Sequence, residues 1–291
     1  MPLAPEKLNE LEAVAVEAAK QAGAMIQAEA GKTREVQHKE GGDTLASQVV
    51  TEVDLEADRI IREMLGESIA KYDLGLLTEE TRDDASRHRC EYFWCIDPLD
   101  GTLPFIKGEP GYSVSIALVS REGVAQVGVV FDPLTATLYQ ARRGAGARRN
   151  GELWTVEKDR VSEGGDVPFS LVVDRSFGEQ PELVEKFGGI ATATGLSGVE
   201  IVGYGGAALN ACWVVEKAPA VYFKFPKKND GGGSLWDFAA AACLFGELGL
   251  RATDIHGEPL KLNRRESTFM NLDGVVLASD EKIAEAVRGF Y

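Results

Sequence analysis

The chain has 291 residues, of which 44% are hydrophobic and 26% are charged, a composition typical of a globular enzyme with a sizeable core. Its formal net charge of −15 argues against non-specific binding to nucleic acid or to an anionic membrane, so we expect neither partner. An anionic ligand would need cations brought into its binding site.

Three further features of the sequence favour a cytoplasmic protein. The amino terminus, MPLAPEKLNELEA, lacks the basic start and apolar run of a secretory signal. No stretch approaches the roughly 18 apolar residues that span a bilayer. The four cysteines include no CxxC pair and only three histidines accompany them, so we expect neither a zinc site nor a disulfide framework.

The first half of the chain combines helices with a run of strands. Apolar residues at helical spacing predict amphipathic helices over 6–30 and about 52–66, with the Gly-rich loop HKEGGDTLAS between them. Short β-rich segments joined by turns then predict an antiparallel meander, at residues 92–96, 112–120, 124–131 and 136–143. This pattern indicates an α+β half over residues 1–155.

Strands and helices alternate in the second half, 156–291. SLVVDRS and PAVYFKF predict strands, and GGAALNACWVVEKA predicts a helix rich in small residues. The loop KKNDGGG leads into a further helix, SLWDFAAAACLFGELG, which Gly249 ends. We therefore expect an α/β half here. Because no Pro/Ser-rich linker separates the halves, we predict a single compact unit over 1–291.

Acidic residues stand at the edges of these elements. Glu79 ends the apolar run LGLLTEE, Asp97 and Asp100 follow the strand YFWCI, and Asp54 and Asp237 lie near the starts of two helices. Carboxylates gathered in one place would repel one another unless a metal ion lay between them, and Mg²⁺ prefers oxygen ligands. The set is therefore a candidate cage for divalent cations.

Local structure offers another interpretation of each residue. TEVD (51–54) and SLWD (234–237) fit capping boxes, in which the acidic residue accepts a hydrogen bond from an orphan backbone N–H. The Asp-Pro and Asp-Gly pairs of DPLDGT are common in turns, and Glu79 with Glu80 fits a solvated loop. Each alternative suffices for its own residue, but together they do not predict the joint occurrence.

Three motifs in order resemble the inositol monophosphatase superfamily of Mg²⁺-dependent phosphatases, which includes bisphosphate nucleotidases and fructose-bisphosphatases. They are LLTEE, WCIDPLDGT and LWDFAAAA, and VTEVD and GGAALNACWVVEKAPAVYF also match the family's segments. The resemblance covers nearly the whole chain. It implies an α/β fold arranged as a layered αβαβα sandwich, and lithium-sensitive phosphatase activity.

The resemblance also implies which residues bind metal. Glu79, Asp97 and the main-chain carbonyl of Leu99 would bind a first ion, and Asp97, Asp100 and Asp237 would bind a second. Two or three Mg²⁺ ions are expected, with Mn²⁺ as a substitute. Such ions lower the pKa of an attacking water and stabilise both oxygens of an in-line displacement.

Catalytic and phosphate-binding roles follow from the same resemblance. Asp54 and Thr102 would orient and deprotonate the attacking water. Gly101 and Thr102 would begin a helical turn whose N–H groups face the substrate phosphate, and Gly205 would also contact the substrate. The substrate is thus expected to be a small phosphorylated molecule.

Details of the motifs favour the 3′(2′),5′-bisphosphate nucleotidase branch. The FIKG continuation after DGTLP and the segment DRSF resemble that branch. Leu103 and Phe177 depart from it, because nucleotidases commonly carry Lys and His there. Arg175, Lys224, Lys227 and Lys228 are candidate contacts to a second phosphate, although the lysines also fit a solvated basic loop.

Two other functions stay open. The chain could be an inositol-1-monophosphatase or another sugar phosphatase of the superfamily, or a catalytically idle metal-binding or interaction protein. Many relatives form homodimers, and the predicted hairpin VVFDPLTATLYQARRG carries apolar positions that could pack against a second copy or belong wholly to the core.

Overall fold

The seven-stranded sheet at the centre of the first half forms from the predicted meander. In this computed structural model, which describes residues 3–32, 37–38, 49–156, 167–175, 181–193 and 195–291, its strands lie in chain order. They are β3 (Gly75–Thr78), β4 (Tyr92–Asp100), β5 (Ser113–Ser120), β6 (Ala125–Asp132), β7 (Thr137–Arg142), β8 (Ala147–Arg149) and β9 (Glu152–Leu153). β4 to β7 pair antiparallel as predicted. The short strands β8 and β9, which were not predicted, extend the antiparallel sheet, and β3 is parallel to β4.

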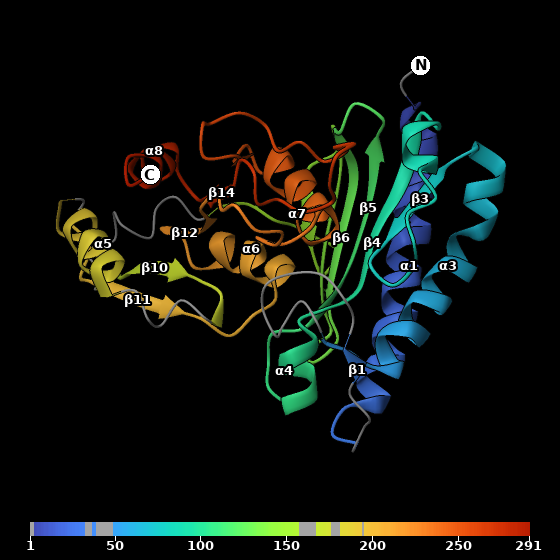
Figure 1. Cartoon of the computed structure of the whole chain (residues 1–291), viewed down its shortest axis with the longest axis horizontal. Helices are drawn as coiled ribbons and strands as arrows, with labels where there is room; N and C mark the ends of the chain where they lie inside the picture. Colours follow the sequence, from blue (N-terminus) through green and yellow to red (C-terminus); the bar gives the residue numbers. More distant parts are fainter. Residues whose placement is uncertain (1–2, 33–36, 39–48, 157–166, 176–180, 194) are drawn as a thin grey trace.

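Helices cover both faces of this sheet (Figure 1). Successive residues of a strand point to opposite faces, so Trp94 and Ile96 of β4 pack with α1 (Pro5–Glu29) and α3 (Glu52–Tyr72). Phe93 and Cys95 face the other side, where α6 (Ala207–Glu216) and α7 (Leu235–Glu247) lie. Both faces of β4 are therefore buried, which explains the uninterrupted apolar run YFWCI in its first part.

A five-stranded sheet lies beyond α6 and α7 (Figure 1). Its order is β11-β10-β12-β14-β13, with bounds β10 (Phe169–Val172), β11 (Val199–Val202), β12 (Ala220–Lys224), β13 (Arg251–Thr253) and β14 (Val275–Ala278). The last layer is α5 (Pro181–Ala193) with α8 (Glu281–Arg288); Phe187 of α5 stacks on Phe169 with ring centroids 5.6 Å apart. These five layers confirm the predicted αβαβα sandwich.

The remaining described elements are short. They are β1 (Gln37–His38), β2 (Val49–Val50), α4 (Thr102–Lys107) and the 3₁₀ turn η1 (Ser86–His88). The predicted loop HKEGGDTLAS lies mostly outside the described residues. No helix among the described residues is long and apolar enough to cross a bilayer.

Strand β4 is longer than the sequence predicts. It continues through the DPLD segment to Asp100, with Asp97 opposite Ser115, Asp100 opposite Ser113 and a bulge between them. Pro98 has no N–H to donate to the ladder, and a bulge is one of the few sheet positions that accept proline. The expected tight turn is therefore a bulge within β4.

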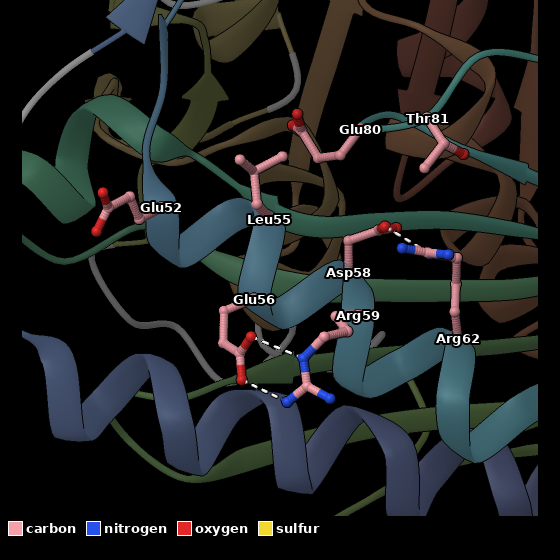
Figure 2. Close-up of a pocket in the computed structure, with 8 residues that line it drawn as sticks. All are labelled: Glu52, Leu55, Glu56, Asp58, Arg59, Arg62, Glu80 and Thr81. Carbon is pink, nitrogen blue, oxygen red and sulfur yellow. Dashed lines mark hydrogen bonds and ion pairs between the residues drawn. The ribbon is translucent and has the colours of Figure 1, made fainter.

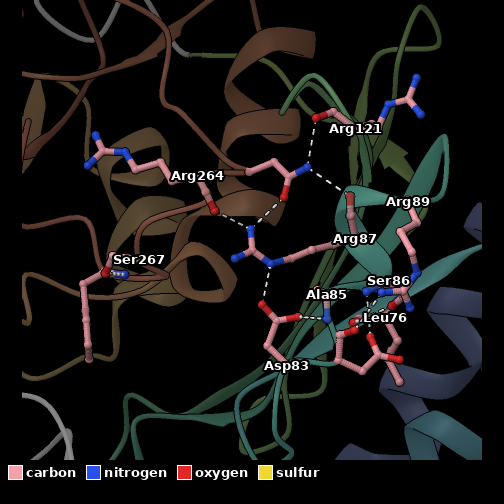
Figure 3. Close-up of polar contacts among 12 residues, drawn as sticks. Leu76, Asp83, Ala85, Ser86, Arg87, Arg89, Arg121, Arg264 and Ser267 are labelled. Atoms are coloured by element: carbon pink, nitrogen blue, oxygen red, sulfur yellow. Dashed lines mark hydrogen bonds and ion pairs between the residues drawn. The ribbon is translucent and has the colours of Figure 1, made fainter.

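A buried arginine fixes the C-terminal segment against the edge of the seven-stranded sheet. Arg87, 2% exposed, donates to Asn263 Oδ1 at 2.7 Å and to the carbonyl of Arg264 at 2.6 Å (Figure 3). Its Nε donates to Asp83 at 2.7 Å. Asn263 Nδ2 donates in return to the carbonyl oxygens of Arg87 and Arg121. These contacts join the 3₁₀ turn η1 to residues 263–264, far later in the chain, beside β3.

Candidate active site

Three carboxylates meet where β4 ends beside α7. Asp97, Asp100 and Asp237 each offer an oxygen atom, and these atoms all lie within 4.8 Å of one another. Asp97 and Asp100 are 2% and 7% exposed, and Asp237 is half-buried. Ser115 of β5 donates to the carbonyl of Trp236 at 3.1 Å, which holds the start of α7 against this edge of the sheet.

The β4 bulge directs the first two aspartates. Leu99 N donates to Asp97 Oδ1 at 3.1 Å, so the bulge is closed by its own side chain. Gly101 follows with φ of 90°, and a Cβ there would lie 2.5 Å from the carbonyl oxygen of Gly111. A larger residue would be both strained and obstructed at this position. The glycine therefore lets the chain turn from β4 into α4.

Asp237 and Asp54 each belong to a capping box, as the local interpretation predicted. Asp237 Oδ2 accepts from Ser234 N at 2.8 Å, and Asp54 Oδ2 accepts from Thr51 N at 2.8 Å. Each nevertheless has a second set of neighbours. Asp54 Oδ1 accepts from Thr102 Oγ1 at 2.9 Å, across two elements far apart in the sequence. The two interpretations are therefore compatible, because the same carboxylate can cap a helix and belong to the candidate site.

Glu79 lies beside the three-carboxylate group. It directly follows β3, and its N–H donates to the carbonyl of Ile96 at 3.2 Å, one residue before Asp97. The charge of Glu79 contributes to raising the pKa of Asp97, Asp237 and Asp54. The parallel pairing of β3 with β4 thus brings the predicted Glu79 to the predicted aspartates.

Burial makes ionisation of these carboxyl groups costly. Removal from water raises the pKa of Asp97 well above its ordinary value, and neighbouring acidic groups raise it further. The same causes raise the pKa of Asp100 to about 8 and that of Asp237 to about 6, although Lys224 opposes the change at both. Oxygen ligands under mutual repulsion fit a hard divalent cation, which would relieve that repulsion.

The start of α6 closes one side of the group. Asp100 accepts from the backbone N–H groups of Ala207 at 3.0 Å and Ala208 at 2.8 Å, where the positive end of a helix dipole favours an anion. A Cβ on Gly206 would lie 2.4 Å from an Asp100 oxygen. The absence of a side chain at Gly206 is therefore what lets this carboxylate approach the helix.

The model of the inositol monophosphatase family matches residues 7–289. The chain belongs to that family. It is 31% identical over 244 residues to the Nus factor SuhB of Vibrio cholerae, covering 84% of this chain and 85% of the relative. It is 29% identical over 278 residues to the inositol-1-monophosphatase of Rhizobium meliloti, covering 94% and 93% of the two chains.

A solved structure agrees with this assignment. CysQ of Bacteroides thetaiotaomicron, described as a bacterial member of the inositol monophosphatase family, is 26% identical with a TM-score of 0.69. The alignment covers 93% of this chain and 98% of that one. The chain is accordingly a phosphatase of the inositol monophosphatase family, as the motifs indicated.

Two of the four predicted cationic residues lie next to acidic partners. Lys224 Nζ lies 3.0 Å from Asp174 Oδ2, and Arg175 lies 2.6 Å from Glu109 Oε2. Lys227 donates its backbone N–H to Asn271, and Lys228 is exposed. The carboxylates therefore compensate Lys224 and Arg175 in this structure. Ser176 and Phe177 of the DRSF motif lie outside the described residues.

Sequence reasoning missed several groups at the site. The N–H groups of Ala207 and Ala208 act through the backbone, and only the run of small residues GGAA signals the close approach. Asp174 was missed as well. It accepts from Tyr222 Oη at 2.7 Å and forms an ion pair with Lys224. No local sequence pattern predicts either contact.

Proposed function

We propose that the chain is a Mg²⁺-dependent phosphomonoesterase that hydrolyses a small phosphate ester. The observation that carries the proposal is the group of three buried or half-buried carboxylates within 4.8 Å of one another. The Thr102–Asp54 hydrogen bond supplies a proton acceptor for the same site. Capping alone would not require either of these arrangements.

In this proposal, two or three Mg²⁺ ions would be held by these carboxylates, and Mn²⁺ would substitute for Mg²⁺. Asp97, Glu79 and the Leu99 carbonyl would provide oxygen ligands for one ion. Asp97, Asp100 and Asp237 would provide them for a second. When bound, such ions would lower the pKa of an attacking water and neutralise charge on the transferring phosphoryl group.

Asp54 and Thr102 handle the proton in the proposed reaction. Thr102 Oγ1 donates to Asp54 Oδ1 at 2.9 Å, so its lone pairs are free to accept from a water molecule, whose proton passes through the hydroxyl to Asp54. Thr51 donates to Asp54 Oδ2 from Oγ1 at 2.6 Å, which holds the carboxylate in place. Burial raises the pKa of Asp54, which favours proton uptake.

A small bisphosphate, such as adenosine 3′,5′-bisphosphate, is the substrate we favour, with Gly101, Thr102 and Gly205 contacting the reacting phosphate. A second phosphate needs cations beyond the metal ions, and Arg175 is one candidate. It donates to both Glu109 and the carbonyl of Tyr204, the residue before Gly205. Its buried Nε has no hydrogen-bond partner among the described residues, so one donor of the guanidinium is left unsatisfied. Lys224, Lys227 and Lys228 are the further candidates.

A specific observation favours inositol 1-phosphate as a second candidate. Arg175 and Lys224 are already compensated by Glu109 and Asp174, so a second phosphate would compete with these carboxylates. The relative from Rhizobium meliloti is also named an inositol-1-monophosphatase. A monoester would need neither cation.

A phosphate-release panel at one Mg²⁺ concentration tests both levels of the proposal. The esters are adenosine 3′,5′-bisphosphate, adenosine monophosphate, inositol 1-phosphate, inositol 1,4-bisphosphate and fructose 1,6-bisphosphate. We expect EDTA to abolish release and Mg²⁺ or Mn²⁺ to restore it. Two charge-assisted contacts to a second phosphate would raise kcat/KM at least about tenfold over the monophosphate.

Two outcomes would contradict the proposal at different levels. Full phosphate release in excess chelator would overturn the metal-dependent reaction, provided that the Asp97→Asn variant is as active as the wild type. Faster turnover of inositol 1-phosphate than of adenosine bisphosphate would assign the chain to the monophosphatase branch and leave the lysines without a role in substrate binding.

A further inference from the structure

Asp58 is a second buried aspartate on α3, one helical turn after Asp54. The residue is only 1% exposed. Its Oδ2 accepts from Arg62 Nε at 2.6 Å (Figure 2). Its Oδ1 accepts from Thr78 Oγ1 at 2.5 Å. A buried carboxylate is tolerated only when such partners compensate it. None of the motifs that identify the family explains this residue.

The position of Thr78 links Asp58 to the candidate active site. Thr78 is the last residue of β3, is 2% exposed, and lies opposite Ile96 of β4 in the parallel pairing. Glu79 comes next, and its N–H donates to the Ile96 carbonyl. The backbone next to Glu79 is therefore held from two sides, by α3 through Thr78 and by β4 through Ile96.

Strand alternation sets the direction of each side chain. Ile96 packs among residues of α1 and α3, while Leu77 packs on the other face with α7. Because neighbouring side chains alternate, Thr78 points toward α3 and a continuation of the strand points Glu79 toward the face where Asp237 begins α7. Anchoring Thr78 to α3 thus selects the face on which Glu79 emerges.

We propose that Asp58 is a positioning residue that, through Thr78, fixes the carboxylate of Glu79 for divalent-metal binding. The inference rests on the proposed role of Glu79 as a metal ligand. According to this proposal, two residues of α3 one helical turn apart support the site. Asp54 holds Thr102 at the start of α4, and Asp58 holds Thr78 at the end of β3. Partners behind metal ligands typically change metal affinity about 10- to 100-fold when they are removed.

Arg62 maintains this arrangement from the solvent side. Its side chain is partly exposed and lines an open surface pocket of about 370 Å³ together with Asp58, Glu80 and Thr81 (Figure 2). By satisfying Oδ2, Arg62 leaves Oδ1 committed to Thr78. A purely structural role for Asp58 would require only that the helix stay attached to the sheet.

Thr78→Val provides the direct test, because valine keeps the shape and strand preference of threonine and removes the hydroxyl. Ser68→Ala is the matched control. Ser68 lies on the same helix and accepts from Trp94 Nε1 of β4 at 3.0 Å, so its loss also removes a buried helix-to-sheet hydrogen bond. Thr78→Ser keeps a hydroxyl and is the rescue variant, and Thr78→Ala repeats the test if the valine variant does not fold.

Mn²⁺ binding by calorimetry, without substrate, is the measurement, alongside unfolding temperature in EDTA. We expect Thr78→Val to weaken Mn²⁺ binding about tenfold, Thr78→Ser to restore it, and Ser68→Ala to keep wild-type affinity despite a comparable loss of stability. Wild-type affinity in both Thr78→Val and Thr78→Ala, or equal weakening in Ser68→Ala, would overturn the positioning role alone. Absence of Mn²⁺ binding by the wild-type protein would instead overturn the proposed metal site and this inference with it.

Discussion

Replacing Asp237 with asparagine separates a metal ligand from a helix cap. Asparagine keeps an oxygen that accepts from Ser234 N, so the capping box survives while the charge is lost. We expect the variant to be more stable than the wild type without metal, and to lose at least about a hundredfold in kcat with Mg²⁺. The two effects have one cause, a carboxylate held among like charges.

The pKa of Asp237 sets the size of the stability effect. It rises from 3.8 to about 6 in the fold, chiefly because the group is removed from water. Each tenfold change in proton affinity corresponds to about 1.4 kcal/mol, so ionising this carboxyl costs the folded state up to about 3 kcal/mol. Asp237 is half-buried, and solvent screening reduces the expected gain to about 1–2 kcal/mol, or a few degrees in Tm.

The sign of the pH dependence is fixed by the raised pKa. Below about pH 4, the carboxyl is protonated in both folded and unfolded chains, so wild type and variant should differ little. As pH rises from about 4 to about 6, the unfolded chain releases its proton first, and the wild type loses stability relative to Asp237→Asn. Above about pH 6, the difference should be constant.

Thermal unfolding in EDTA at pH 4, 5, 6 and 7.5, with phosphate release in Mg²⁺, measures both effects. Asp280→Asn is the matched control, since Asp280 caps α8 by accepting from Lys282 N at 2.8 Å and lies at an exposed position. The control should change neither quantity appreciably. An unchanged or lower Tm for Asp237→Asn in EDTA, combined with intact turnover, would mean that Asp237 is a cap and no more.

Two further substitutions test other parts of the site. Thr102→Val removes the hydroxyl that donates to Asp54, so kcat should fall about 10²- to 10³-fold while Mn²⁺ binding stays at its wild-type affinity; an equal loss of Mn²⁺ affinity would show that Thr102 supports the metal site instead. Glu109→Gln releases Arg175 from its ion pair, so KM for adenosine 3′,5′-bisphosphate should fall about twofold to fivefold and KM for adenosine monophosphate should not change. Equal changes for the two esters would exclude Arg175 as a contact to the second phosphate.

Much of the fold was predictable because its signals are local. The antiparallel strands β4 to β7 alternate or run apolar, with short turns from β5 onward, and α1 and α3 carry an apolar stripe at helical spacing. Parallel pairing was not predicted for β3, whose four residues give no such signal. The bulge in β4 was also missed, because the same letters, DPLD, are compatible with a turn and with an interrupted ladder.

The sequence by itself determined the identities of the groups at the site. The order of LLTEE, DPLDGT and LWD, each at the end of a strand or the start of a helix, singled out Glu79, Asp97, Asp100 and Asp237. Short-range geometry accounts for this. A capping box or a strand end is specified by residues within a few positions of one another, so the sequence motif alone identifies the carboxylate that it contains.

Only the tertiary structure decided which partners these groups meet. Asp100 reaches the N–H groups of α6, Asp58 reaches Thr78, and Lys224 reaches Asp174, each across elements that are distant in the chain. Such contacts depend on the stacking of five layers and on strand register, which follow from burial of apolar surface over the whole chain. A local pattern can place a carboxylate at the end of a strand, but the packing of that strand against its neighbours determines which atoms the carboxylate contacts.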